Sequence, residues 1–160
     1  MTERIISGIS VANPREAIPP GYTPIDATSR SKNWSRELSP FFVGPCRLYE
    51  RFVSQNVENG WQFSKVYKNF LSAEGEILPG YWDWAKKGWN DSYAHRYPAG
   101  KGAVPAFLYW NGEHLQYIES RLKVYLPLYS RAVVKTTAFE KLYKLSEERP
   151  ITLIDFDVYA

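Results

Sequence analysis

Three side chains capable of chemistry lie at helical spacing in one short stretch of the sequence: Glu58, Gln62 and Lys65. At about 100° per residue they share one arc of a predicted helix over residues 57–71, while apolar side chains occupy the opposite arc. A carboxylate, an amide and an amine on one surface could protonate, orient or covalently capture a substrate. The same spacing is also typical of an ordinary solvated helix face with a Glu58–Gln62 hydrogen bond. The spacing alone leaves both interpretations open.

The order of residues around these three side chains resembles a known family. The stretch Val57-Glu58-x-x-Trp61-Gln62-x-x-Lys65 is similar to the V-E-H-x-Y-Q-x-x-K helix of the NADAR domain family, which is related to NAD and ADP-ribose metabolism. Upstream, residues 38–42 (L-S-P-F-F) resemble that family's L-S-N-F-Y segment, at about the family's separation from the helix. The resemblance covers roughly residues 36–70. It departs at Asn59, where the family has His, and in residues 155–159 (D-F-D-V-Y), which only loosely match the closing D-x-W-G.

This resemblance implies a fold and an activity. The expected fold is a single NADAR-like α+β domain over residues 1–160, mainly helical with a few short strands. The implied activity is cleavage of an N-glycosidic bond in a substrate that joins ADP-ribose or a ribose phosphate to a base. Such a reaction passes through positive charge at the anomeric carbon, so it needs a carboxylate near that carbon and a proton donor for the departing nitrogen.

The resemblance also assigns roles to residues. Glu58 and either Asp155 or Asp157 would supply the carboxylate and the proton donor. Lys65 would form an imine with an opened ribose or hold a phosphate, and these two roles stay open. The expected substrate-binding residues are Gln62, Trp61, Arg96, Lys101, Trp89, Ser39 and Phe41.

The elements that must position these residues follow from the pattern of the chain. Residues 1–37 are rich in Pro and polar residues, which favours a wrapping arm with short strands near 5–11 and 22–26. Ser54 or Asn56 is the expected N-cap of the central helix, and Gly60 inside it indicates close packing or ligand approach. A short helix over 81–89 carries three of the six Trp residues, mostly as core.

The second half of the chain should complete the site. Residues 93–105 form a predicted loop in which Arg96 and Lys101 could embrace a phosphate. A strand is expected over 107–110, a turn at 111–112, and helices over 113–125 and 128–147. A final strand over 151–158 would place Asp155 and Asp157 on one face, which is either a solvated edge or the counterpart of the family's acidic motif.

Composition limits the classes of function. The 160 residues are 44% hydrophobic and 16% aromatic, with a net charge of +3 and scattered basic residues, so a duplex-DNA footprint is not indicated. No apolar run is long enough to span a bilayer, and no secretory leader is visible. The single cysteine, Cys46, has no partner for an intramolecular disulfide, which favours a cytoplasmic protein. Its side chain is expected to be a small buried apolar group. No metal site or cofactor motif is visible.

Two further functions remain possible on the sequence alone. The first is a non-catalytic module, of phage or host type, that sequesters a nucleotide-derived ligand in an aromatic pocket; the second is a structural protein whose aromatics are only core. The expected partner is a small nucleotide-like ligand or ADP-ribosylated nucleic acid. A pocket that gathers Glu58, Lys65 and an aspartate would favour catalysis, and a pocket without clustered carboxylates would favour binding.

Overall fold

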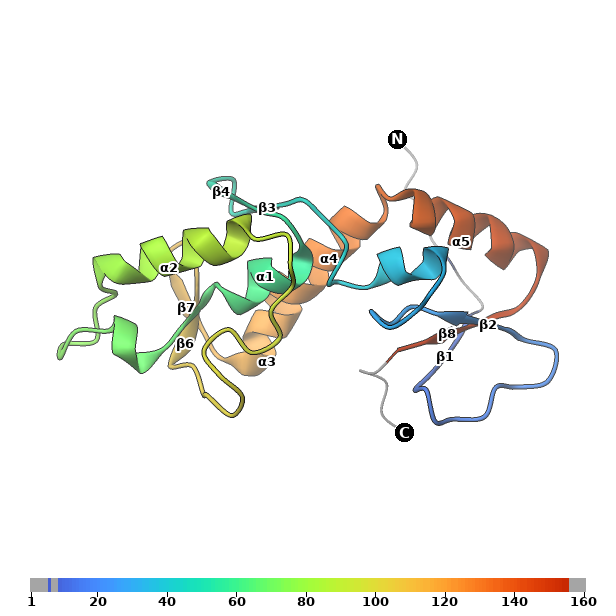
Figure 1. The fold of residues 1–160 in the computed structure, drawn as a ribbon, viewed down its shortest axis with the longest axis horizontal. Coiled ribbons are helices and arrows are strands. Elements are labelled where there is room, and N and C mark those ends of the chain that lie inside the picture. The colour runs from blue at the N-terminus through green and yellow to red at the C-terminus, as the bar shows by residue number, and fades with distance from the viewer. Residues whose placement is uncertain (1–5, 7–8, 156–160) are drawn as a thin grey trace. The chain divides into compact units, whose positions relative to one another are not determined.

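The fold is a mixed α+β arrangement of short elements. The computed structural model describes residues 6 and 9–155, and it contains both helices and strands (Figure 1). The chain divides into two compact units, one formed by Met1–Phe42 with Val133–Ala160 and the other by Val43–Ala132. Among the described residues, no helix is long and apolar enough to cross a membrane.

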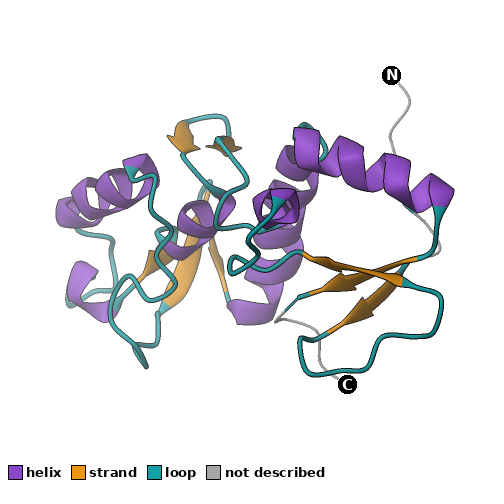
Figure 2. Ribbon diagram, turned by 45° about the vertical axis from the view of Figure 1, so that its right-hand side comes forward, coloured by secondary structure: helices purple, strands orange, loops and turns teal. Residues whose placement is uncertain are grey.

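The first unit is built on a parallel sheet with the C-terminal strand in its centre. Strand β8 (Ile151–Ile154) lies between β1 (Ser10–Ala12) and β2 (Thr23–Asp26) and runs parallel to both. Helix α5 (Thr137–Glu148) lies to one side of this sheet (Figure 2) and contacts the 3₁₀ helix η1 (Trp34–Leu38). The segment predicted as a wrapping arm therefore contributes both flanking strands of this sheet.

The second unit combines two antiparallel sheets with helices. One sheet pairs β3 (Cys46–Leu48) with β4 (Phe52–Ser54), and the other has the order β5 (Lys65–Val66), β6 (Phe107–Trp110), β7 (Glu113–Leu115). The strand predicted over 107–110 and the turn at 111–112 are confirmed, and both turn residues have positive φ. The helical elements of this unit are α1 (Val57–Gln62), η2 (Lys68–Phe70), α2 (Pro79–Asn90), α3 (Tyr117–Ser120), the π-helix η3 (Arg121–Tyr125) and the start of α4 (Leu126–Val133).

Helix α1 begins where predicted and ends much earlier. Asn56 is its N-cap, because the side chain accepts a hydrogen bond from the backbone N–H of Asn59 at 2.8 Å. The prediction of a helix to residue 71 is wrong, since the chain leaves the helix after Gln62 and Lys65 pairs with Leu108 across an antiparallel ladder. All six residues of α1 are buried, so the helix has no solvated face.

The helices predicted near the C-terminal half are also shorter than expected. Residues 113–115 form strand β7 rather than the start of a helix. The helix predicted over 128–147 is wrong as one element, because α4 ends at Val133 and α5 begins at Thr137 after its N-cap Thr136. The Thr136 hydroxyl accepts a hydrogen bond from the backbone N–H of Phe139, which favours a new helix start over continuation.

Two glycines allow close packing in the second unit. A Cβ on Gly60 would lie 3.1 Å from the Leu48 side chain, so the close packing expected at this position is confirmed. A Cβ on Gly88 would lie 2.2 Å from the ring of Phe63. Helix α2 can therefore approach the end of α1 only because residue 88 has no side chain.

Candidate functional site

The three predicted polar side chains form one hydrogen-bonded series. The Gln62 amide donates to the Glu58 carboxylate at 3.0 Å, and the Lys65 ammonium donates to the Gln62 carbonyl oxygen at 2.9 Å. Glu58 and Gln62 are each only 5% exposed. A buried carboxylate linked to a lysine through a bridging amide differs from a solvated helix face, because its geometry is fixed on both sides of the bridge.

Lys65 combines a partly buried amine with an aromatic surface. Its ammonium lies 3.9 Å from the centre of the Trp61 ring, which is within cation–π range. Burial lowers the pKa of Lys65 to about 8, while the charge of Glu58 raises it and that of Arg121 lowers it further. An amine with this pKa is present in both protonated and neutral forms near neutral pH, so it can act as an acid, a base or a nucleophile.

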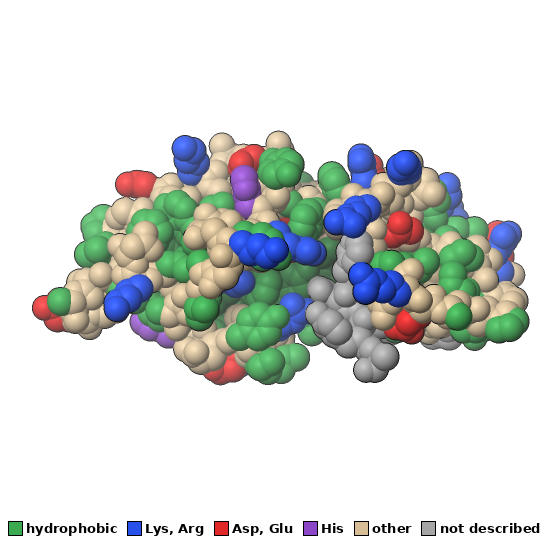
Figure 3. Space-filling model, turned by 60° about the horizontal axis from the view of Figure 1, so that its bottom comes forward, with side chains coloured by type: hydrophobic (Ala, Val, Ile, Leu, Met, Phe, Trp, Pro, Cys, Tyr) green, Lys and Arg blue, Asp and Glu red, His purple; other side chains and the backbone are tan. Residues whose placement is uncertain are grey.

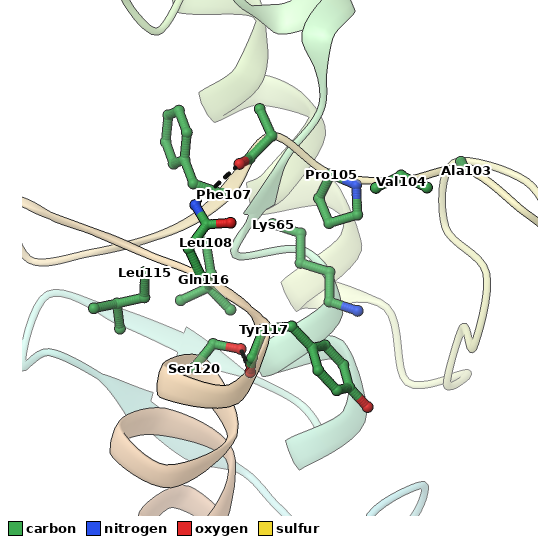
Figure 4. Close-up of a pocket in the computed structure, with 11 residues that line it drawn as sticks. Lys65, Ala103, Val104, Pro105, Phe107, Leu108, Leu115, Gln116, Tyr117 and Ser120 are labelled. Atoms are coloured by element: carbon green, nitrogen blue, oxygen red, sulfur yellow. Dashed lines mark hydrogen bonds between the residues drawn. The ribbon is translucent and has the colours of Figure 1, made fainter.

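A cavity of about 380 Å³ opens beside Lys65. Figure 4 shows the Lys65 side chain extending between Pro105 and Tyr117. The wall is mainly apolar and comes from the loop before β6, from β6 and β7, and from the start of α3. The lining residues are Lys65, Ala103, Val104, Pro105, Ala106, Phe107, Leu108, Leu115, Gln116, Tyr117 and Ser120. Of the described residues that line it, Lys65 supplies the charge and none is a carboxylate.

Helices α3 and η3 close the site on the side of Trp61. The indole N–H of Trp61 donates to the Ser120 hydroxyl at 3.3 Å, and that hydroxyl donates to the carbonyl of Tyr117 at 2.8 Å. The Arg121 guanidinium lies 5.7 Å from the Trp61 ring centre and 5.1 Å from that of Tyr125. Arg121 is therefore a basic group close to Lys65, and local sequence patterns do not predict it because it lies outside the matched segments.

The Asn59 side chain binds the loop that follows α2 to helix α1. Its side-chain N–H₂ donates to the carbonyls of Asp91 and Tyr93 at 3.1 and 2.8 Å, and its carbonyl oxygen accepts from the backbone N–H of His95 at 2.8 Å. Asn59 is fully buried. Asn59, where the resembling family has His, thus fixes the loop after α2. Its three hydrogen bonds use both the N–H₂ donors and the carbonyl acceptor of the side-chain amide.

The other predicted residues lie in several places. Arg96 and Lys101 are exposed, while the later part of the same loop, residues 103–106, lines the cavity. Trp89 is 1% exposed and lies on α2. On the face drawn in Figure 3, Lys and Arg side chains occur in several separate groups among hydrophobic and acidic ones.

Three of the predicted residues that the structure describes lie in the first unit. Ser39, Phe41 and Asp155 belong to the first unit, where Ser39 is buried and Asp155 donates its backbone N–H to the carbonyl of Ala12 at 3.0 Å. Strand β8 ends at Ile154, before Asp155. Asp157 lies outside the described residues.

Cys46 behaves as a buried apolar group. It is 8% exposed, and burial raises the pKa of its thiol to about 12. A thiol with this pKa stays protonated near neutral pH, so it is a weak nucleophile.

Comparison with known proteins gives no assignment. No family model matches the chain, and neither the curated proteins nor the solved structures include a significant match.

Proposed function

We propose that the chain is a divergent NADAR-like, mainly helical N-glycosidase that acts on an ADP-ribose or ribose-phosphate N-glycoside in the cytoplasm. The observation that carries this proposal is Lys65, whose amine has a pKa near 8 and extends into a cavity of about 380 Å³. The linked Glu58 supports the proposal, because its position matches the family's most specific residue. The substrate is a small nucleotide-like ligand or an ADP-ribosylated nucleic acid.

In this proposal Lys65 is the group that meets the ribose. As a neutral amine it adds to the anomeric carbon of the ring-opened glycoside, and the proton that its nitrogen then loses passes to the base nitrogen. The bond between that carbon and the base nitrogen breaks, which leaves an imine on Lys65, and water hydrolyses the imine to release the sugar aldehyde and restore the amine. As an ammonium it instead holds a phosphate of the substrate. Glu58 acts on this step through Gln62, since its negative charge stabilises positive charge developing near Lys65.

The direct test is release of ADP-ribose. The purified chain is incubated with ADP-ribosylated nucleosides and with ADP-ribosylated DNA, and free ADP-ribose is followed by chromatography. The proposal expects release from at least one of these substrates, and loss of release in Lys65→Ala. If neither substrate is turned over but a ligand still binds, the enzyme proposal would be wrong and the binding module would be favoured.

A non-catalytic binding module is the second candidate. It is favoured by the cavity wall, which is mainly apolar and carries no carboxylate among the described lining residues. A pocket of this kind can hold a flat ring on Tyr117 or Phe107 while Lys65 pairs with an anion. The two candidates separate in one experiment, because a binder saturates with ligand and releases it unchanged.

A further inference from the structure

A second depression lies between the β3–β4 hairpin and helix α2. It has a volume of about 400 Å³ and is lined by Phe52, Val53, Lys86, Lys87, Trp89 and Asn90. Among the described residues it shares no lining residue with the cavity beside Lys65. Nothing in the proposed glycosidase reaction uses it.

The floor of this depression is aromatic. Phe52 stacks on Trp82 with ring centres 5.7 Å apart and planes 23° apart, and it also packs against Trp89 at 5.0 Å. Val53 remains 51% exposed although it lines the depression. A planar apolar body would cover this surface and remove it from water.

The rim of the depression is positively charged. Lys86 and Lys87 both line the depression, and the Lys86 ammonium lies 5.8 Å from the centre of the Phe52 ring. Cations held beside an aromatic floor attract an anionic group attached to a ring.

Trp89 lines the depression with an almost fully buried side chain. It is 1% exposed, and its indole N–H has no hydrogen-bond partner among the described residues. A buried donor without an acceptor is uncommon in folded proteins and calls for an explanation at that place. The indole nitrogen itself is enclosed by protein, so Trp89 serves as a reporter of the depression that it lines and not as a donor to a ligand.

We propose that the depression between β4 and α2 binds an organic anion that carries a planar ring, with the chemistry of a nucleotide unit. The ring lies against Phe52 and Val53, and the phosphate lies beside Lys86 and Lys87. A free nucleotide and one unit of a single-stranded nucleic acid share this chemistry. The proposal does not depend on the glycosidase reaction, since it uses other residues.

Binding is tested on the full chain with three probes: adenosine 5′-monophosphate, adenosine, and inorganic phosphate. The indole N–H signals are followed by two-dimensional NMR, with the Trp89 signal assigned by the Trp89→Phe variant. The expected result is that the monophosphate binds at least several-fold more tightly than either fragment and shifts the Trp89 signal. Equal binding of monophosphate and phosphate, or an unmoved Trp89 signal, would overturn the proposal.

Matched variants locate the site. Lys86→Gln should weaken binding of the monophosphate by roughly fivefold while leaving adenosine unaffected, because it removes a charge and leaves the floor intact. Val53→Glu, at an exposed position, should weaken it at least as much. Lys68→Gln, which removes an exposed lysine of η2, should leave the shift of the Trp89 signal by the monophosphate unchanged. An equal loss in Lys68→Gln and Lys86→Gln would show a general charge effect and contradict the proposal.

A short oligodeoxyadenylate distinguishes the two sources of this ligand. Tighter binding of the oligonucleotide than of the monophosphate, with a steep fall as salt rises, identifies a single strand as the occupant. Comparable binding of both identifies the free nucleotide. In either case Lys86→Gln must weaken binding, and an oligonucleotide affinity that the variant leaves unchanged would contradict the proposal.

Discussion

At the scale of single residues, Lys65 is the most informative side chain. Its pKa falls from 10.5 to about 8, chiefly because burial penalises the charged form. The unfolded chain therefore binds more protons than the folded chain between pH 8 and 10.5, so this residue makes the folded state more stable as pH rises through that window. Below pH 8 the full cost of holding the charged amine is present.

Lys65→Met removes this titration. Relative to the variant, the free energy of unfolding of the natural chain should rise by about 1–2 kcal/mol between pH 7 and pH 10.5. This value is smaller than the full pKa shift would give because Lys65 is partly solvated. Urea unfolding of both proteins at the two pH values measures the difference. Lys68→Met, at an exposed lysine, is the control and should show no such change. A difference that is constant with pH would show that Lys65 titrates as an ordinary lysine.

Borohydride trapping separates the two roles of Lys65. If its amine forms an imine, reduction during turnover should leave a covalent protein–ribose adduct, detected by mass spectrometry on the peptide that contains residue 65. Lys65→Ala should give no adduct. If the amine only holds a phosphate, the natural chain gives no adduct either, and the variant loses affinity that high substrate restores.

Glu58→Gln tests the buried carboxylate. The substitution keeps the size of the side chain and removes its charge, so turnover should fall by at least about 100-fold while ligand affinity stays within roughly tenfold. Single-turnover kinetics and ligand titration measure the two quantities. Gln62→Glu is a comparison that adds a charge beside the same lysine. Full activity in Glu58→Gln would count against the resemblance at its most specific residue.

The sequence predicts some of these contacts and misses others for a physical reason. The Glu58–Gln62 hydrogen bond follows from their i, i+4 positions on a helix, and it is confirmed. Helical spacing places Lys65 on the same face as Gln62 but does not predict the bond between them, which forms with Lys65 on a strand. Arg121 belongs to a distant segment, and its approach to Trp61 depends on tertiary packing that local spacing does not contain.

At the scale of elements, helix α1 shows what local patterns can and cannot predict. Its start is predicted correctly because capping is a local interaction of Asn56. Its end depends on distant strands, since the backbone N–H of Tyr109 donates to Ser64 at 2.9 Å and β5 then pairs with β6. Apolar spacing continues past Gln62 in a helical pattern, but the ladder satisfies the backbone groups of residues 64–66 instead.

Asn59 ties α1 to the loop after α2 through three side-chain hydrogen bonds. Asn59→Asp places a carboxylate against the carbonyls of Asp91 and Tyr93, so it should destabilise the fold by about 3 kcal/mol or more at pH 7. The loss should shrink as pH falls and the new carboxyl is protonated. Chemical denaturation at pH 7 and pH 5 measures it. The exposed Asn69→Asp is the control, and an equal loss in both would contradict the role given to Asn59.

At the scale of the whole molecule, the chain forms two units of different connectivity. The second unit is one continuous segment, while the first is closed by a strand from the far end of the sequence. Strand β8 is central because its two backbone edges pair with β1 and β2. The strand is predicted from its β-branched content, but a single sequence does not specify that both of its partners come from the N-terminal segment.

Ile151→Ala tests this arrangement. Ile151 is fully buried at the start of β8, so its truncation should cost about 2–4 kcal/mol. Hydrogen exchange should accelerate in β8 and α5 more than in α1 and β6. The exposed Ile118→Ala, in the second unit, is the control. Equal acceleration in both units would mean that they unfold as one cooperative body.

The contact between Gly88 and Phe63 has a consequence for relatives of this chain. Because a Cβ on residue 88 would lie 2.2 Å from the Phe63 ring, we expect the two positions to vary together among homologues. A homologue with an aromatic residue at position 63 should keep glycine at position 88. A homologue with a larger residue at position 88 should carry a small residue at position 63. This covariation gives a signature by which distant homologues of the second unit can be recognised.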